Sequence, residues 1–126
     1  MAGKGLESTV VYIVDDDAPV REGFARLLRA ANLEPRAYAT AEQFLDEFRP
    51  EPRACVLLDL SLPHLAAWAV QAQLKDRLLL LPVIAISARD DAGWARCLGA
   101  NLFLRKPVDD QALLDAIEWV IGGNGA

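Results

Sequence analysis

Acidic, hydroxyl and basic side chains follow four short apolar runs of this 126-residue chain. They are Asp15, Asp16 and Asp17 after the first run, Asp59 within the second, Ser87 at the end of the third and Lys106 after the fourth. Clustered carboxylates repel one another and stay ionised together only when a cation such as Mg²⁺ joins them. A carboxylate is also a nucleophile toward phosphorus, and a metal, a lysine and a hydroxyl neutralise the phosphoryl oxygens. The set therefore predicts phosphoryl transfer to an aspartate with Mg²⁺ as the cofactor.

The elements that must position these residues alternate between strand and helix. Continuous apolar runs over Val10–Val14, 54–60 and 80–87 favour strands buried on both faces, and weaker strand patterns cover 34–39 and 101–105. Helical spacing covers 20–31, a segment from Thr40 with Gln43 as its capping box, 66–77, and a segment from Asp109 or Asp110. This alternation predicts an α/β fold whose parallel sheet carries helices on both faces. Ligands of such sheets bind at the carboxyl ends of the strands, where the polar residues stand.

Composition and charge limit the remaining possibilities. The chain has a net charge of −5 and 53% hydrophobic residues, which suits one globular domain and predicts no direct contact with nucleic acid. Its apolar runs are too short to span a membrane. Cys55 and Cys97 are far apart, and Cys55 lies in an apolar run, so we expect a cytoplasmic protein with a buried structural thiol. We expect one domain over 9–122 between flexible tails at 1–8 and 123–126.

Four segments of the chain resemble the receiver domains of two-component response regulators. They are Tyr12–Asp17, Val56–Pro63, Pro82–Ala88 and Arg105–Pro107. The likeness runs from about residue 10 to about residue 121, and Val20–Gly23 is most similar to regulators with a helix-turn-helix output domain. It implies a doubly wound, flavodoxin-like domain with strand order 2-1-3-4-5. It also implies a phosphoacceptor rather than an enzyme, which receives its phosphoryl group from a sensor histidine kinase or a phosphotransfer protein and switches conformation to control an output.

The resemblance assigns the metal ligands residue by residue. Asp59 is implied as the phosphoacceptor and, with Asp16, as a direct ligand of Mg²⁺. The main-chain carbonyl of Ser61 is implied as a further ligand, and Asp15 as a ligand through a water molecule.

The resemblance also assigns the groups that contact the phosphoryl oxygens. Ser87 is implied as a donor to one of these oxygens, and Lys106 as their cationic partner. The peptide bond between Lys106 and Pro107 is implied to be cis. Asp17 and His64 receive no role, since Asp17 suits a helix cap and His64 stands alone in a loop.

Three departures from the family pattern concern the output face. The stretch between Ser87 and Lys106 is shorter than usual and contains Gly93, so we expect a shortened helix there. Ala67 stands near the usual glycine, and Phe103 lacks the hydroxyl of a tyrosine. The family further implies a homodimer through the fourth helix, fifth strand and fifth helix.

Two other functions compete with the receiver interpretation. In a haloacid-dehalogenase-like phosphatase, Asp15 and Asp17 would be the nucleophile and the acid, but Asp59 would then have no role and no cap domain fits the length. A degenerate receiver that serves only as a docking module is the other alternative. Core or partly covered packing is expected for the three tryptophans, with Trp94 as the best interface candidate over Trp68 and Trp119.

Overall fold

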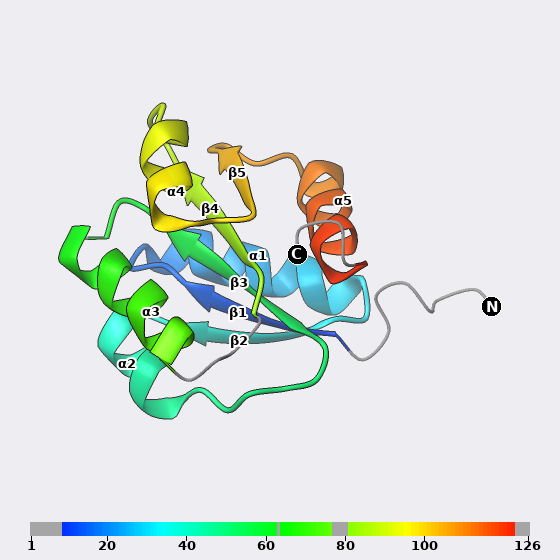
Figure 1. The fold of residues 1–126 in the computed structure, drawn as a ribbon. Coiled ribbons are helices and arrows are strands. Elements are labelled where there is room, and N and C mark those ends of the chain that lie inside the picture. Colours follow the sequence, from blue (N-terminus) through cyan, green and yellow to red (C-terminus); the bar gives the residue numbers. More distant parts are fainter. Residues whose placement is uncertain (1–8, 63, 77–80, 123–126) are drawn as a thin grey trace.

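The computed structural model describes residues 9–62, 64–76 and 81–122, which form five strands and five helices in alternation (Figure 1). The expected tails at 1–8 and 123–126 lie outside the described residues. In chain order the elements are β1 (Val10–Val14), α1 (Ala18–Ala30), β2 (Glu34–Tyr38), α2 (Ala41–Glu47), β3 (Ala54–Asp59), α3 (His64–Asp76), β4 (Val83–Ser87), α4 (Ala92–Leu98), β5 (Leu102–Arg105) and α5 (Asp110–Ile121).

The strands form one parallel sheet in the order β2-β1-β3-β4-β5, which confirms the predicted topology. Every residue of β1, β3 and β4 is buried, as their continuous apolar runs predicted. Proline cannot donate a ladder hydrogen bond, and Pro35 accordingly lies in β2, at the edge of the sheet.

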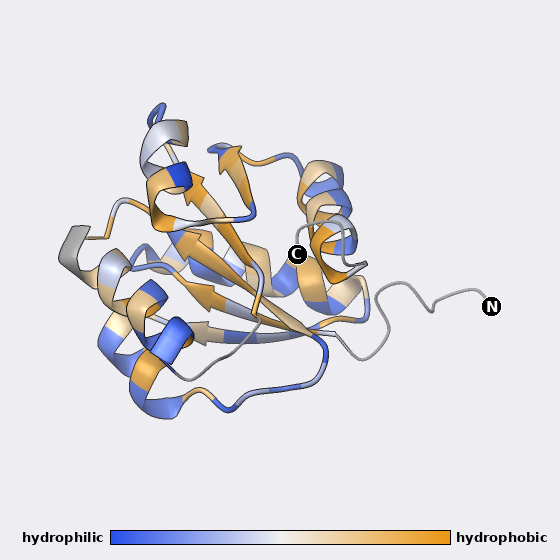
Figure 2. Ribbon diagram, in the orientation of Figure 1, coloured by the Kyte–Doolittle hydropathy of each residue, from blue (hydrophilic) through white to orange (hydrophobic). Residues whose placement is uncertain are grey.

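Helices cover both faces of the sheet and enclose two apolar cores. Residues of α1 and α5 pack on one face, and residues of α2, α3 and α4 pack on the other. Figure 2 shows mostly hydrophobic central strands between helices that carry both hydrophilic and hydrophobic residues. In the core that α2, α3 and α4 cover, Tyr12 contacts the rings of Phe44 and Phe48 edge-on. These two layers hold the carboxyl ends of the strands at one rim.

Local capping residues fix where the helices begin. Asp17, Thr40 and Asp109 each accept the backbone N–H of the third residue beyond them, so they cap α1, α2 and α5. Gln43 departs from a strict capping box because its side chain accepts the N–H of Ala39 and not of Thr40.

Helix α4 is short, as predicted, with seven residues. It ends at Gly99, whose φ of 85° lies in the left-handed region that glycine adopts without strain. Its inner face is held by Ala95 and Leu98, which are both buried. Asp91 occupies the N-cap position but makes no capping hydrogen bond with its side chain.

The tryptophans differ in part from the sequence prediction. Trp94 is half-buried and packs edge-on against Trp68, with ring centroids 5.5 Å apart. Trp68 and Trp119 are 46% and 42% exposed, more than expected. Cys55 is buried as predicted, and burial raises the pKa of its thiol to about 12. Among the described residues, no helix is long and apolar enough to cross a membrane.

Candidate functional site

The strand register brings the predicted site residues to one rim of the sheet. Val14 pairs with Leu58, so Asp15 and Asp59 follow side by side on β1 and β3, where the strand order reverses. Asp59 pairs with Ile86, which places Ser87 one residue further along β4. Arg105 in turn pairs with Ser87, so Lys106 follows at the end of β5.

Asp15 is a buried carboxylate whose two oxygens have separate partners. Its Oδ1 accepts the backbone N–H of Asp17 at 2.9 Å, and its Oδ2 accepts from Nζ of Lys106 at 3.1 Å. Burial raises the pKa of Asp15, and the negative charge of Asp59 raises it further, whereas the Asp17 N–H and Lys106 oppose the rise. The net pKa lies above the ordinary value, so the ionised form is costly without a further cation.

Asp59 is buried at the centre of the rim, and Ser61 contacts both of its oxygens. The backbone N–H of Ser61 donates to Oδ1 at 3.0 Å, and the Ser61 hydroxyl donates to Oδ2 at 2.6 Å. The resemblance assigned a role only to the carbonyl of Ser61, so the contact of its side chain was missed. A serine two residues after an aspartate often bonds locally in this way, which is the signal that sequence reasoning overlooked.

Lys106 supplies the positive charge between the two buried carboxylates. Its Nζ lies 3.1 Å from Asp15 Oδ2 and 3.5 Å from Asp59 Oδ1. Burial alone would lower the pKa of Lys106, but the charges of Asp59 and Asp15 outweigh that effect and raise it. The ammonium group therefore stays protonated. The Lys106–Pro107 peptide bond is cis, as the family likeness implied.

The acidic residues have the chemistry of a magnesium site. Asp15, Asp16 and Asp59 each offer one carboxylate oxygen, and these oxygens lie within 4.8 Å of one another. Asp16 is exposed while the other two are buried, so an ion would have an opening to solvent on the Asp16 side. Hard carboxylate oxygens with room for water suit Mg²⁺, which retains several waters in proteins. The residues present therefore fit this ion.

Ser87 lies at the predicted rim, but its hydroxyl does not bond to Asp59. The hydroxyl donates to Oδ2 of Asp91 at 2.6 Å and accepts the backbone N–H of Arg89 at 3.0 Å. Asp91 is therefore a second residue that sequence reasoning missed, and an aspartate four residues beyond the hydroxyl was its only sequence signal. The side chain of Asp17 caps α1, as the simpler interpretation predicted. The side chain of His64 lies outside the described residues.

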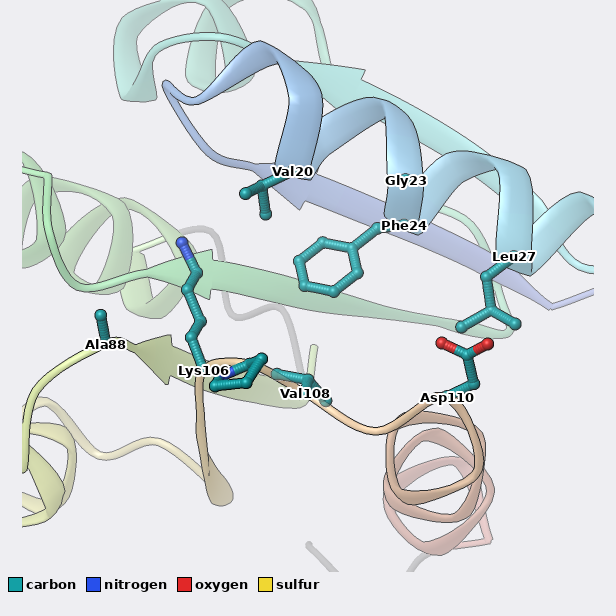
Figure 3. A pocket seen from close by; sticks show the side chains of 9 residues that line it. Val20, Gly23, Phe24, Leu27, Ala88, Lys106, Val108 and Asp110 are labelled. Carbon is teal, nitrogen blue, oxygen red and sulfur yellow. The ribbon is translucent and has the colours of Figure 1, made fainter.

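An apolar groove opens beside this rim, between α1 and the segment that joins β5 to α5 (Figure 3). It has a volume of about 460 Å³. Phe24, Leu27 and Gly23 line it from α1, and Lys106 and Val108 line it from the opposite side. The groove is thus lined by the same lysine whose Nζ contacts Asp15.

Comparison with known proteins decides the family. A family model described as the response regulator receiver domain matches residues 11–118. The chain belongs to this family. Receiver domains are signalling domains that generally are not enzymes, that bind Mg²⁺ at their acidic site and that interact with histidine kinases or phosphotransfer proteins. No comparison supports the phosphatase alternative, in which Asp17 would act as an acid and not as a helix cap.

Curated relatives and solved structures agree with this assignment. The transcriptional regulatory protein TdiR of Thauera aromatica is 35% identical over 98% of this chain and 56% of that protein, and FixJ of Azorhizobium caulinodans is 34% identical over 92% and 56%. Response regulator StyR superposes with a TM-score of 0.80 at 39% identity, covering 93% of this chain and 61% of that one. A receiver protein from Burkholderia phymatum gives 0.78 at 35% identity, covering 91% and 96%. This receiver domain spans about half the length of the curated relatives named.

Proposed function

We propose that this receiver domain accepts a phosphoryl group on Asp59. The observation that carries the proposal is the position of Asp59, a buried carboxylate between the acidic residues that follow β1 and the ammonium group of Lys106. Asp15 is the other buried carboxylate, and it lies closer to Nζ of Lys106 than Asp59 does, at 3.1 Å against 3.5 Å. Asp16 is exposed to solvent and lies outside this contact network.

The transfer is a simple displacement at phosphorus. One oxygen of the Asp59 carboxylate forms a bond to phosphorus, and the phosphorus–nitrogen bond of a phosphohistidine breaks. The imidazole leaves with the electron pair of that bond and takes up a proton from solvent, which gives an acyl phosphate and neutral histidine. The N–H and the hydroxyl of Ser61 each occupy one lone pair of an Asp59 oxygen, so a second lone pair remains on that oxygen for the bond to phosphorus.

The metal ligands proposed are Asp16, Asp59 and the main-chain carbonyl of Ser61, with Asp15 acting through a water molecule. When bound, Mg²⁺ supplies positive charge against the phosphoryl oxygens and relieves the repulsion among the carboxylates. Lys106 faces the same space from β5 and pairs with the new phosphate. Ser87 stands on β4 at the same rim and is the proposed hydroxyl donor to a phosphoryl oxygen.

The groove beside Lys106 is the proposed contact surface for the protein that donates the phosphoryl group. A phosphohistidine must reach Asp59, so its carrier has to cover the surface around the rim. The groove is an apolar part of that surface and is lined by Phe24 and Val108. Apolar area beside the reacting groups is what a protein donor needs for a contact of moderate strength.

The output proposed for the full-length protein is transcriptional control in the cytoplasm, because the curated relatives named are transcriptional regulators. The receiver itself is proposed to contact protein and not nucleic acid, since it carries a net charge of −5. A homodimer through α4, β5 and α5 is the corresponding proposal for the active form.

The test is to map the acyl phosphate. The chain is incubated with acetyl phosphate and Mg²⁺, reduced with borohydride, and analysed by peptide mass spectrometry. We expect labelling at Asp59 and its loss in Asp59→Asn, with Asp17→Asn as a control that keeps its capping oxygen. Label on Asp15 would favour the phosphatase alternative, and an unlabelled wild type would favour a docking module.

A further inference from the structure

The hydroxyl of Ser87 has a partner that competes with its proposed role. It donates its proton to Oδ2 of Asp91 at 2.6 Å, and it is 1% exposed, so water is no alternative partner. A serine hydroxyl has a single proton to donate. Ser87 therefore cannot donate to a phosphoryl group on Asp59 while the bond to Asp91 persists.

Asp91 in turn occupies a position where its carboxylate has another use. It is the residue before α4, yet its side chain caps nothing, and its backbone has φ −105° and ψ 24°. Asp17, Thr40 and Asp109 stand at the same position of α1, α2 and α5, where they are extended and accept a backbone N–H. Aspartate is among the strongest capping residues, so Asp91 lacks a favourable contact in the state in which its Oδ2 holds the Ser87 hydroxyl.

We infer that Asp91 holds the Ser87 hydroxyl in the unphosphorylated protein, and that when this hydroxyl turns to the phosphoryl group the freed Asp91 carboxylate caps α4. The inference rests on the proposed phosphorylation of Asp59. In both states each side chain has a partner. The Ser87 hydroxyl donates first to Asp91 and then to the phosphoryl group, and the Asp91 carboxylate accepts first from Ser87 and then from a backbone N–H of α4. It requires ψ of Asp91 to rotate toward the extended values of the other caps, which moves the first turn of α4.

The contacts around this turn show where the movement leads. Arg89 lies 3.7 Å from the same Asp91 oxygen, but its side chain is 70% exposed, so this ion pair is a weak restraint. Trp94 lies in α4 and packs edge-on against Trp68 of α3. A shift of the first turn of α4 therefore changes this tryptophan pair, which lies at the protein surface.

The substitution Asp91→Asn separates the two uses of the side chain. Asparagine caps helices as well as aspartate does, but its neutral amide oxygen is a weaker acceptor for the Ser87 hydroxyl. The probe is BeF₃⁻ with Mg²⁺, titrated against tryptophan fluorescence. We expect Asp91→Asn to bind BeF₃⁻ about five- to tenfold more tightly than the wild type, since bonds to charged and neutral acceptors differ by this order.

Matched variants decide whether the bond itself is responsible. Asp90→Asn removes the same charge one residue earlier and should leave the affinity unchanged. In a Ser87→Ala background, Asp91→Asn should bring no gain because the bond is already absent. An equal gain in Asp90→Asn, a gain that persists with Ser87→Ala, or no gain in Asp91→Asn would overturn the inference.

Hydrogen exchange tests the capping step. BeF₃⁻ should slow exchange in the first turn of α4 in the wild type and in Asp91→Asn, but not in Asp91→Ala. Equal slowing in Asp91→Ala would show that the freed carboxylate does not cap the helix. If the wild type shows no BeF₃⁻ response that depends on Asp59, the proposed function itself fails, and the inference fails with it.

Discussion

Lys106 places its Nζ 3.1 Å from Oδ2 of Asp15, a residue 91 positions earlier in the chain. This contact joins β5 to β1 across the rim, and the same Nζ lies 3.5 Å from Asp59. Two buried carboxylates thus share one cation. The stability of the metal-free domain and the chemistry of Asp59 therefore depend on the same side chain.

Replacing Lys106 by methionine should destabilise the metal-free domain. The two carboxylates would then lack their cation, and the cost should be about 1–3 kcal/mol, below that of a fully buried pair because Lys106 retains some contact with water. Urea unfolding with and without Mg²⁺ measures the effect, and Mg²⁺ should restore more stability than in the wild type. Lys75→Met, on the exposed side of α3, is the control and should change little. A Lys106→Met variant as stable as the wild type would show that the ion pairs of Lys106 contribute nothing to the stability of the metal-free domain.

Removing the exposed carboxylate of the acidic cluster should weaken Mg²⁺ binding. Asp16→Asn removes one of the three clustered negative charges, together with the repulsion between that charge and the other two. We expect a smaller rise of Tm on addition of Mg²⁺, with a metal-free protein at least as stable as the wild type. A hundredfold excess of Mg²⁺ over its Kd adds about 2.7 kcal/mol, so the difference is measurable. Asp17→Asn is the control, and an unchanged Mg²⁺ response in Asp16→Asn contradicts the ligand assignment.

The raised pKa of Asp15 predicts a specific dependence of stability on pH. Because its pKa in the folded chain exceeds the ordinary 3.8, folding favours the protonated form. The stabilising contribution is fully present below 3.8 and is lost as pH rises through the folded pKa. Without Mg²⁺, the free energy of unfolding of the wild type should therefore fall relative to that of Asp15→Asn across this window. If the difference in free energy of unfolding between the two proteins stayed constant with pH, the raised pKa of Asp15 would be contradicted.

The sequence was sufficient to predict the strands and the residues that follow them. Continuous apolar runs predicted the buried strands, and the carboxyl ends of parallel strands necessarily meet at one rim. Asp15, Asp59 and Lys106 therefore came together as predicted, although 91 residues separate the first from the last.

Sequence reasoning could not decide between partners of similar strength. The position of Ser87 at the rim was predictable, but the side-chain rotamer that bonds to Asp91 depends on how the short loop before α4 closes. The hydroxyl contact of Ser61 depends on a local rotamer in the same way. The exposure of Trp68 was missed because apolar residues surround it on all sides of α3, so the spacing does not show which face is buried.

The groove beside Lys106 predicts a difference between protein and small-molecule phosphodonors. A Cβ added at Gly23 meets no atom within 4 Å, so a side chain can project from α1 without disturbing the fold. Gly23→Gln should obstruct the groove and slow transfer from a cognate phosphorylated histidine kinase about tenfold or more, because a lost interface contact of this kind costs on the order of 1–2 kcal/mol. Labelling by acetyl phosphate, which needs no docking surface, should be unchanged.

Gly23→Ala is the matched control for this experiment. Both substitutions raise helix propensity and should stabilise α1 by a few tenths to about 1 kcal/mol, but only glutamine reaches far from the helix. Transfer from the kinase should therefore stay near the wild-type rate in Gly23→Ala. The groove would be excluded as the donor surface if both variants accepted phosphate from the kinase at equal rates. If Gly23→Gln also lost labelling by acetyl phosphate, the substitution would be acting on the acidic site, and Lys106, which lies on the far side of the groove, would be the residue to examine for displacement.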